Sequence, residues 1–226
     1  MPDMRPLLIF GASRGVGLEL ARLERAAGRP VAAMLRQQSD AGHLQEIGVE
    51  ILRGDALSRQ EIEQALARLS GPFDVLSTLS GRGEGGRLVD DEGNINVIEA
   101  AAASGRAERF VFITSMGCGD MAAYRSERAI AAFGAVVDAK TLAEDRLKET
   151  GLDWTILRPG GLVSEPSTGN GMLTQNPRVH GFIHRADVAL LAFRVLRDPA
   201  TSRHALAAVD RNRMSCDTPV EPFSLA

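Results

Sequence analysis

Residues 7–20, with the sequence LLIFGASRGVGLEL, contain a short apolar run that breaks into glycines and then resumes with helical spacing. This pattern predicts a strand, a tight turn and a helix. Gly11 would let the chain leave the strand sharply, Gly15 would let the backbone approach a pyrophosphate, and Gly17 would let the helix pack against the sheet. A helix that begins at Gly15 also directs its free N–H groups and positive dipole end at phosphates. An ordinary strand-to-helix turn is the alternative, but glycines placed between a strand and a helix favour dinucleotide binding.

Strands and helices continue to alternate along the rest of the chain. Further strands are predicted at 31–35, 49–53, 74–79, 109–114, 153–157 and 205–209, and helices at 58–69, 88–104, 135–149 and 183–196. This alternation predicts an α/β fold, with one doubly wound parallel sheet and helices on both faces, in a single domain over residues 1–226. The segments 117–133 and 160–182 are predicted to be small substrate-lid elements, and 212–226 an irregular tail.

Composition narrows the class of protein. A length of 226 residues suits one domain with a substantial core, and a formal net charge of −3 leaves no basic stripe for nucleic acid or an anionic membrane. Cys118 and Cys216 lie far apart without metal-ligand spacing, so free thiols and no metal site are predicted. No apolar run has the length of a signal-peptide core or a membrane span, so we expect a cytoplasmic monomer or homodimer that binds a small molecule.

The end of the second predicted strand bears on the choice of cofactor. Proteins that bind NAD place an Asp or Glu at this position for the ribose 2′-hydroxyl, whereas this chain has Arg36 there. A guanidinium suits a 2′-phosphate, and Arg14 in the glycine turn adds a second cation. Either arginine could instead be a solvated surface residue, but two at these positions predict NADP(H).

Polar residues follow several other strands, at the edge where open α/β sheets bind ligands. Asp55 follows the third strand, where it would either cap the next helix region or hydrogen-bond an adenine amino group. Asp90, Gly93 and Asn96 recur at three-residue steps in the next predicted helix, so they are predicted to share one face.

Five segments carry a family resemblance: GASRGVG (11–17), DDEGNINVIEAA (90–101), FVFITSMG (110–117), KTLAEDRLKETGLDWTILRPGGL (140–162) and IHRADVA (183–189). Together they resemble the atypical short-chain dehydrogenase/reductases, in the NAD(P)H-binding group that includes biliverdin reductase B (flavin reductase) and NmrA-like proteins. The resemblance extends from Leu7 to about Val209. It implies a Rossmann sheet with NADP(H) lying across the strand ends and a substrate pocket over the nicotinamide.

The resemblance also implies roles for individual residues. Ser115 matches the active-site serine, and Lys140 matches the lysine that holds the nicotinamide ribose hydroxyls. Only two of the 26 basic residues are lysines, which supports a specific use for one of them. The alternatives are a strand-end cap for Ser115 and a surface position for Lys140. The implied cofactor contacts are Gly11, Ala12, Ser13, Arg14, Gly15, Val16, Arg36, Asp55, Ala56, Leu79, Ser80, Gly81, Ser115, Lys140, Pro159, Gly160 and Gly161.

One departure from the family pattern affects the predicted chemistry. The larger branch has a tyrosine four residues before this lysine, and Val136 occupies that position here. The only tyrosine, Tyr124, lies before the predicted helix and is a candidate substitute acid. We therefore predict an NADPH-dependent oxidoreductase that transfers hydride to a small conjugated acceptor such as a flavin or quinone. A non-catalytic NADP(H) sensor of the NmrA-like type, or an epimerase or isomerase, is the alternative.

Overall fold

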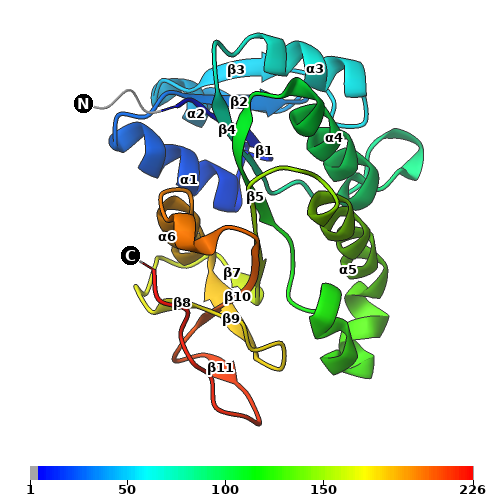
Figure 1. The fold of residues 1–226 in the computed structure, drawn as a ribbon, viewed down its shortest axis with the longest axis vertical. Helices are drawn as coiled ribbons and strands as arrows, with labels where there is room; N and C mark the ends of the chain where they lie inside the picture. The colour runs from blue at the N-terminus through cyan, green and yellow to red at the C-terminus, as the bar shows by residue number, and fades with distance from the viewer. Residues whose placement is uncertain (1–4, 226) are drawn as a thin grey trace.

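A computed structural model describes residues 5–225, except for the side chain of Glu84. In this part of the chain, eight strands form one sheet in the order β3-β2-β1-β4-β5-β6-β10-β8 (Figure 1). All neighbouring pairs are parallel except β10 and β8, so the predicted parallel sheet is confirmed and has an antiparallel strand at one edge. The strands are β1 (Leu7–Phe10), β2 (Val31–Leu35), β3 (Glu50–Arg53), β4 (Phe73–Ser77), β5 (Ala107–Ile113), β6 (Trp154–Pro159), β8 (Gly171–Thr174) and β10 (His204–Asp210).

Helices cover both faces of this sheet, as the alternation of elements predicts (Figure 1). One face packs against α1 (Gly15–Ala26), α2 (Gly42–Glu46) and α6 (Arg185–Val195), and the other against α3 (Arg59–Ala67), α4 (Asn94–Ser104) and α5 (Glu127–Lys148). Strand β1 shows how the sequence builds two cores. Leu7 and Ile9 join the first apolar cluster, whereas Leu8 and Phe10 join the second, because successive side chains of a strand point to opposite faces.

Two helices begin at residues other than those that the sequence predicts. The helix expected from residue 88 opens with a π-helical turn, Val89–Gly93, before α4 begins. The helix expected from residue 135 begins already at Glu127, because the Ser126 hydroxyl caps it by accepting the backbone N–H of Ala129 at 3.2 Å. A 3₁₀ helix, Gly119–Tyr124, precedes that cap. The segment 117–133 is therefore mostly helical. No amphipathic pattern marks the start of α5, because residues 127–133 include no buried side chain and apolar Ile130 and Phe133 are exposed there.

The segment 160–182 is also more regular than the sequence predicts. It contains β7 (Gly161–Val163), β8 and most of β9 (His180–His184), and β9 extends to the residue before α6. Strands β7 and β9 form a small sheet with β11 (Met214–Ser215), which interrupts the otherwise irregular tail. These strands are two to five residues long, too short for a reliable alternation of polar and apolar residues.

Within residues 5–225, no helix combines the length and the apolar character needed to cross a lipid bilayer.

Candidate cofactor-binding site

A groove of about 1010 Å³ runs along the carboxyl ends of β1, β2, β3 and β4. It is the place where an open α/β sheet binds its ligand. Ten residues of the predicted cofactor site line it: Gly11, Ser13, Arg14, Gly15, Val16, Arg36, Asp55, Ala56, Leu79 and Ser80.

The glycine turn at the start of the groove has the local geometry that its sequence predicts. Gly11 has a φ of +91°, and a Cβ there would lie 3.0 Å from the backbone of Thr78, so the chain leaves β1 through a turn that only glycine fits. A Cβ on Gly17 would lie 2.5 Å from the carbonyl oxygen of Gly11, so α1 packs directly on the turn. Ala12 is fully buried beneath it and does not line the groove.

The first turn of α1 is open toward the groove. Among the described residues, no side chain caps this helix, and its first turn has no acidic residue. The N–H groups at a helix start need partners, and here they face a groove that an anion can enter.

Two arginines bring positive charge to the groove. Arg14 and Arg36 are exposed and both line it. Arg53 stabilises the turn after β2 by donating to the carbonyl oxygens of Arg36 and Ser39, each at 2.8 Å. These bonds use the backbone of Arg36, so its side chain remains available to line the groove. Asp55 also lines the groove, and one of its carboxylate oxygens accepts the N–H of Leu57 at 2.9 Å. Asp55 therefore closes a turn after β3, whereas the cap predicted for the next helix is provided by Ser58, whose hydroxyl accepts the N–H of Glu61 at 3.4 Å.

Lys140 is buried, with its ammonium group at the end of β4. Its Nζ donates to the carbonyl oxygen of Leu79 at 2.9 Å and lies 3.1 Å from Asp90 Oδ1. The carboxylate of Asp90 also accepts the hydroxyl of Ser80 at 2.7 Å and the N–H of Gly81 at 2.8 Å. The surface position is therefore wrong for Lys140, and the lysine and Asp90 together fix the loop 79–81, whose Leu79 and Ser80 line the groove.

Asp90 is a site residue that sequence reasoning missed, although its spacing carried a signal. Asn96, predicted to share its face, donates from Nδ2 to the carbonyl oxygen of Ala56 at 3.0 Å, and a Cβ on Gly93 would lie 3.5 Å from the Cβ of Ala56. The shared face thus contacts the loops after β3 and β4, both of which line the groove.

Arg185 is the second residue that the sequence did not assign. It opens α6, within the segment IHRADVA, and lines the groove from the opposite side. Its Nη1 donates to Ser164 Oγ at 2.7 Å and to the carbonyl oxygen of Leu162 at 3.3 Å. Its Cδ lies 3.4 Å from the position that a Cβ on Gly15 would take. The other unassigned lining residues are Phe10, Met34, Leu35, Ser39, Asp40, Gly54, Thr78, Arg82, Gly83, Val89, Leu162 and Ser164.

The remaining predicted residues do not line the groove in the described part of the chain. Ser115 lies at the carboxyl end of β5, beside β4, and its hydroxyl donates to the carbonyl oxygen of Met116 at 3.2 Å. Tyr124 is 38% exposed, and the guanidinium of Arg178 lies 5.2 Å from its ring centroid.

Pro159 ends β6, and the two glycines that follow it, Gly160 and Gly161, have a packing role. A Cβ on Gly160 would overlap the carbonyl oxygen of Gly181, and one on Gly161 would lie 2.6 Å from the ring of Phe182. These glycines let β7 approach β9 closely. The predicted cofactor contacts of this turn, and the predicted substrate-lid role of residues 160–182, remain predictions.

A buried ion pair lies next to the carboxyl end of β5. The Arg158 side chain is 3% exposed and Glu144 is 0% exposed, and Arg158 Nη2 lies 2.6 Å from Glu144 Oε2. Burial lowers the pKa of Arg158, but its bonds to Glu144 and Asp120 outweigh this and raise it above the usual value. Thr114 donates its hydroxyl to Glu144 at 2.7 Å, so the network anchors the residue next to Ser115.

Comparison with known proteins finds similar sequences and structures over most of the chain. A family model described as NAD(P)H-binding matches residues 11–199. The solved structure of ChuY from Escherichia coli O157:H7, described as an anaerobillin reductase, is 36% identical, with a TM-score of 0.84 over 92% of this chain and 98% of that one. ChuY from E. coli CFT073 is 37% identical, with a TM-score of 0.80 over the same shares. The uncharacterized sugar epimerase YhfK of Bacillus subtilis is 29% identical over 95% of this chain and 96% of its own length.

Proposed function

The chain belongs to the NAD(P)H-binding family, in its atypical short-chain dehydrogenase/reductase group, and from this premise we propose that it is an NADPH-dependent oxidoreductase. The proposed reaction transfers hydride to a small conjugated acceptor. One observation carries the proposal: the groove joins a glycine turn, an uncapped helix start and two exposed arginines along the carboxyl ends of the strands.

The residues of the groove fit a phosphorylated dinucleotide. The open start of α1 would hold the pyrophosphate, since Gly15 leaves the backbone N–H groups accessible. Arg14 and Arg36 would pair with the 2′-phosphate, and Asp55 and Ala56 would contact the adenine. Arg185 would add a cation at the pyrophosphate, because it is the basic side chain that lies against Gly15.

The nicotinamide half would meet the loops after β4 and β5. When bound, the cofactor supplies the hydride. Ser80 and the loop that Lys140 and Asp90 fix would position the ribose, and an ammonium group has three donors, of which Leu79 and Asp90 engage two. Ser115 would donate one hydrogen bond to negative charge that develops on the acceptor.

The acceptor class follows from the missing acid. Reducing a simple ketone forms an alkoxide that must be protonated as it forms, and a positioned acid there contributes about 10²–10⁴-fold. Val136 cannot supply a proton, and the ring of Tyr124 lies against Arg178 rather than in the groove. A conjugated acceptor gives a delocalised anion that water can protonate later. This supports flavins, quinones or similar acceptors, and the likeness to ChuY adds anaerobillin as a candidate.

A screen of NADPH oxidation by the purified protein tests the proposal. We expect turnover with at least one conjugated acceptor among flavins, quinones and anaerobillin, and little or none with simple aldehydes and ketones. Tyr124→Phe should retain activity within a few-fold, and a loss of about a hundredfold or more would show that this tyrosine is the acid. NADPH binding without turnover on any acceptor would contradict the oxidoreductase and favour a sensor.

An epimerase is the second candidate, because the likeness to YhfK covers nearly the whole of both chains. An epimerase on this fold would return the cofactor unchanged after each turnover. Incubation with nucleotide sugars, with the product stereochemistry followed by NMR, separates the two: a change of stereochemistry without net NADPH oxidation would favour it.

A further inference from the structure

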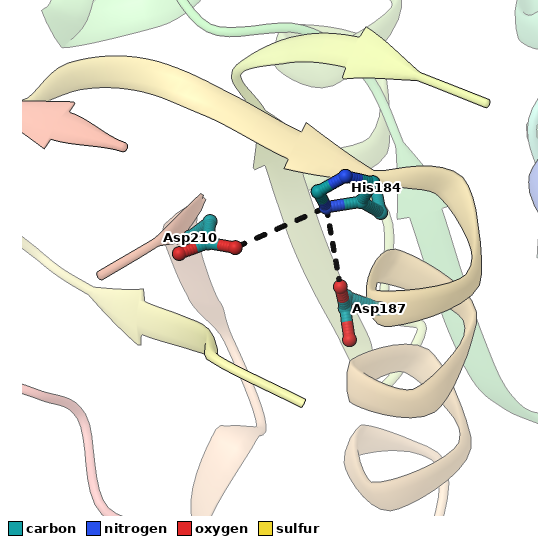
Figure 2. Close-up of side chains that lie close together, drawn as sticks. All are labelled: His184, Asp187 and Asp210. Atoms are coloured by element: carbon teal, nitrogen blue, oxygen red, sulfur yellow. Dashed lines mark ion pairs between the residues drawn. The ribbon is translucent and has the colours of Figure 1, made fainter. Parts of the chain in front are cut away.

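Three buried side chains from separate elements meet beneath the exposed loop 164–169. His184 ends β9, Asp187 lies in the first turn of α6, and Asp210 ends β10. Figure 2 shows one ring nitrogen of His184 facing both carboxylates. His184 Nδ1 lies 3.6 Å from Asp187 Oδ2 and 3.9 Å from Asp210 Oδ2, and the three side chains are 5%, 1% and 1% exposed.

This cluster lacks a partner that its charges require. Among the described residues, His184 Nδ1 makes no hydrogen bond, and no lysine or arginine pairs with either carboxylate. Burying two carboxylates without a cation is costly, and a buried ring nitrogen without a hydrogen-bond partner adds to that cost. Both carboxylates accept hydrogen bonds from neutral donors only, and His184 Nδ1 faces them without a partner, so a cation between the three side chains would satisfy the nitrogen and balance the charge.

The surrounding donors orient the two carboxylates toward this space. Asp187 accepts the hydroxyl of Ser167 and the backbone N–H groups of Thr168 and Gly169, each N–H at 3.0 Å. Asp210 accepts the Thr168 hydroxyl at 2.6 Å and the N–H of Asn212 at 2.8 Å.

The other ring nitrogen of His184 has the neighbour that a metal-bound histidine usually has. Its Nε2 lies 3.7 Å from Glu165 Oε2. A histidine that binds a metal through one nitrogen commonly directs its second N–H at a carboxylate, which fixes the tautomer. The two atoms are too far apart for a hydrogen bond, but a small rotation of the exposed Glu165 side chain would let Nε2–H donate to it, which leaves the Nδ1 lone pair for the ion.

We propose that His184 Nδ1, Asp187 Oδ2 and Asp210 Oδ2 bind a divalent transition-metal ion, with Zn²⁺ the best match to this donor set. Zn²⁺ binds nitrogen and carboxylate oxygen at about 2.0–2.2 Å, which places tetrahedral ligands roughly 3.4 Å apart. The two separations from Nδ1 need only small adjustments to reach this value. Imidazole disfavours Mg²⁺ and Ca²⁺, which prefer oxygen ligands. A dipositive ion with neutral His184 also balances the two carboxylate charges.

The Thr168 hydroxyl lies beside the proposed ion, 3.2 Å from Asp187 Oδ2 and 2.6 Å from Asp210 Oδ2. It or a water would complete the coordination. The ion would join β10, the start of α6 and the exposed loop 164–169, through which it would enter. It would thereby stabilise the rim of the groove, where Arg185 bonds to Ser164. The sequence predicts no metal site, because only the fold brings these three residues together.

The test measures metal binding directly and does not depend on the reductase reaction. Wild-type protein is stripped with a chelator, dialysed against Zn²⁺, and analysed by mass spectrometry for bound metal and by thermal unfolding. We expect one Zn²⁺ per chain and a higher melting temperature. Asp210→Asn and His184→Gln should lose both effects. His43→Gln is the matched control, because exposed His43 lies 3.6 Å from Glu46, and it should behave as wild type.

A second readout covers variants that do not fold. Co²⁺ bound to wild-type protein should give the visible bands of a low-coordinate nitrogen and oxygen site, without the charge-transfer band of a cysteine ligand. No stoichiometric Zn²⁺ on wild type, a thiolate band with Co²⁺, or Zn²⁺ retained by folded Asp210→Asn would overturn the proposal. A protein that binds Zn²⁺ but oxidises no NADPH would support it while contradicting the proposed function.

Discussion

The Arg185 side chain lies beside Gly15 at the mouth of the groove, although Arg185 opens α6 and Gly15 opens α1. The Arg185 Cδ is 3.4 Å from the position of a Cβ on Gly15, and its guanidinium bonds to Ser164 and Leu162. Gly15 has a φ of +61°, which favours glycine there independently of the contact. The cation is thus held next to the place where a phosphate would bind at the start of α1.

Replacing Arg185 with alanine should weaken NADPH and NADH by the same factor, because the pyrophosphate is common to both. One charge-assisted hydrogen bond contributes about 1.5–3 kcal/mol, so we expect a loss of roughly tenfold to a hundredfold in each affinity. Calorimetric titration with both cofactors measures it. Arg194→Ala, in the last turn of the same helix, is the control and should leave both affinities unchanged. Unchanged binding by Arg185→Ala would remove the pyrophosphate role.

Replacing Arg36 with alanine should act on one cofactor only. Wild-type protein should prefer NADPH by about tenfold to a thousandfold, from one or two charge-assisted contacts to the 2′-phosphate. The variant should lose most of this preference while its NADH affinity stays the same. The hydrogen bond that Arg53 donates uses the backbone of Arg36 and survives the substitution. Equal wild-type affinities for the two cofactors would refute the assignment.

Glu144→Gln should destabilise the fold, because it leaves the buried guanidinium of Arg158 without its main counter-ion. Removing one partner of a buried ion pair typically costs 3–5 kcal/mol, and we expect about 3 kcal/mol because Asp120 still pairs with Arg158. Urea unfolding measures the change. Glu149→Gln, which breaks an exposed pair with Arg146 on the same helix, should cost less than about 1 kcal/mol. Equal effects in the two variants would contradict the prediction.

Cys118 should be unreactive toward thiol reagents near neutral pH. Burial raises the pKa of its thiol to about 11, and the nearby charge of Glu144 adds to the effect. Only the thiolate reacts, so native protein should show one accessible thiol, Cys216, and unfolded protein two. Two fast-reacting thiols in native protein would contradict this.

The same shift predicts a loss of stability in alkali. The folded-state pKa of Cys118 lies above the ordinary value of 9.0, so its contribution is complete below that value and is lost as the pH rises toward 11. Urea unfolding across this range, with Cys118→Ala as the comparison, measures the effect. The wild-type free energy of unfolding should fall more steeply than that of the variant.

Local sequence is sufficient to predict structure where the interactions that stabilise an element lie within one short stretch of chain. The strand, turn and helix at 7–20 follow from apolar spacing and from glycines whose missing Cβ atoms are needed within the turn itself. The alternation of elements then predicts the parallel sheet, and a parallel sheet brings its strand ends to one edge. Ten predicted groove residues follow from that rule, because each lies in a loop after a strand or opens the first helix.

Tertiary structure decides the features that depend on partners distant in sequence. The short strands β7, β8, β9 and β11 form only because other strands pair with them. The site of Lys140 depends on Asp90, and the cluster of His184 and Asp187 depends on Asp210. Arg185 reaches the glycine turn because α6 packs against α1. The sequence by itself thus determines the turn, the sheet and the edge where a ligand binds. Only packing determines which buried charges meet, because residues that are distant in sequence become neighbours only when the elements that carry them pack together.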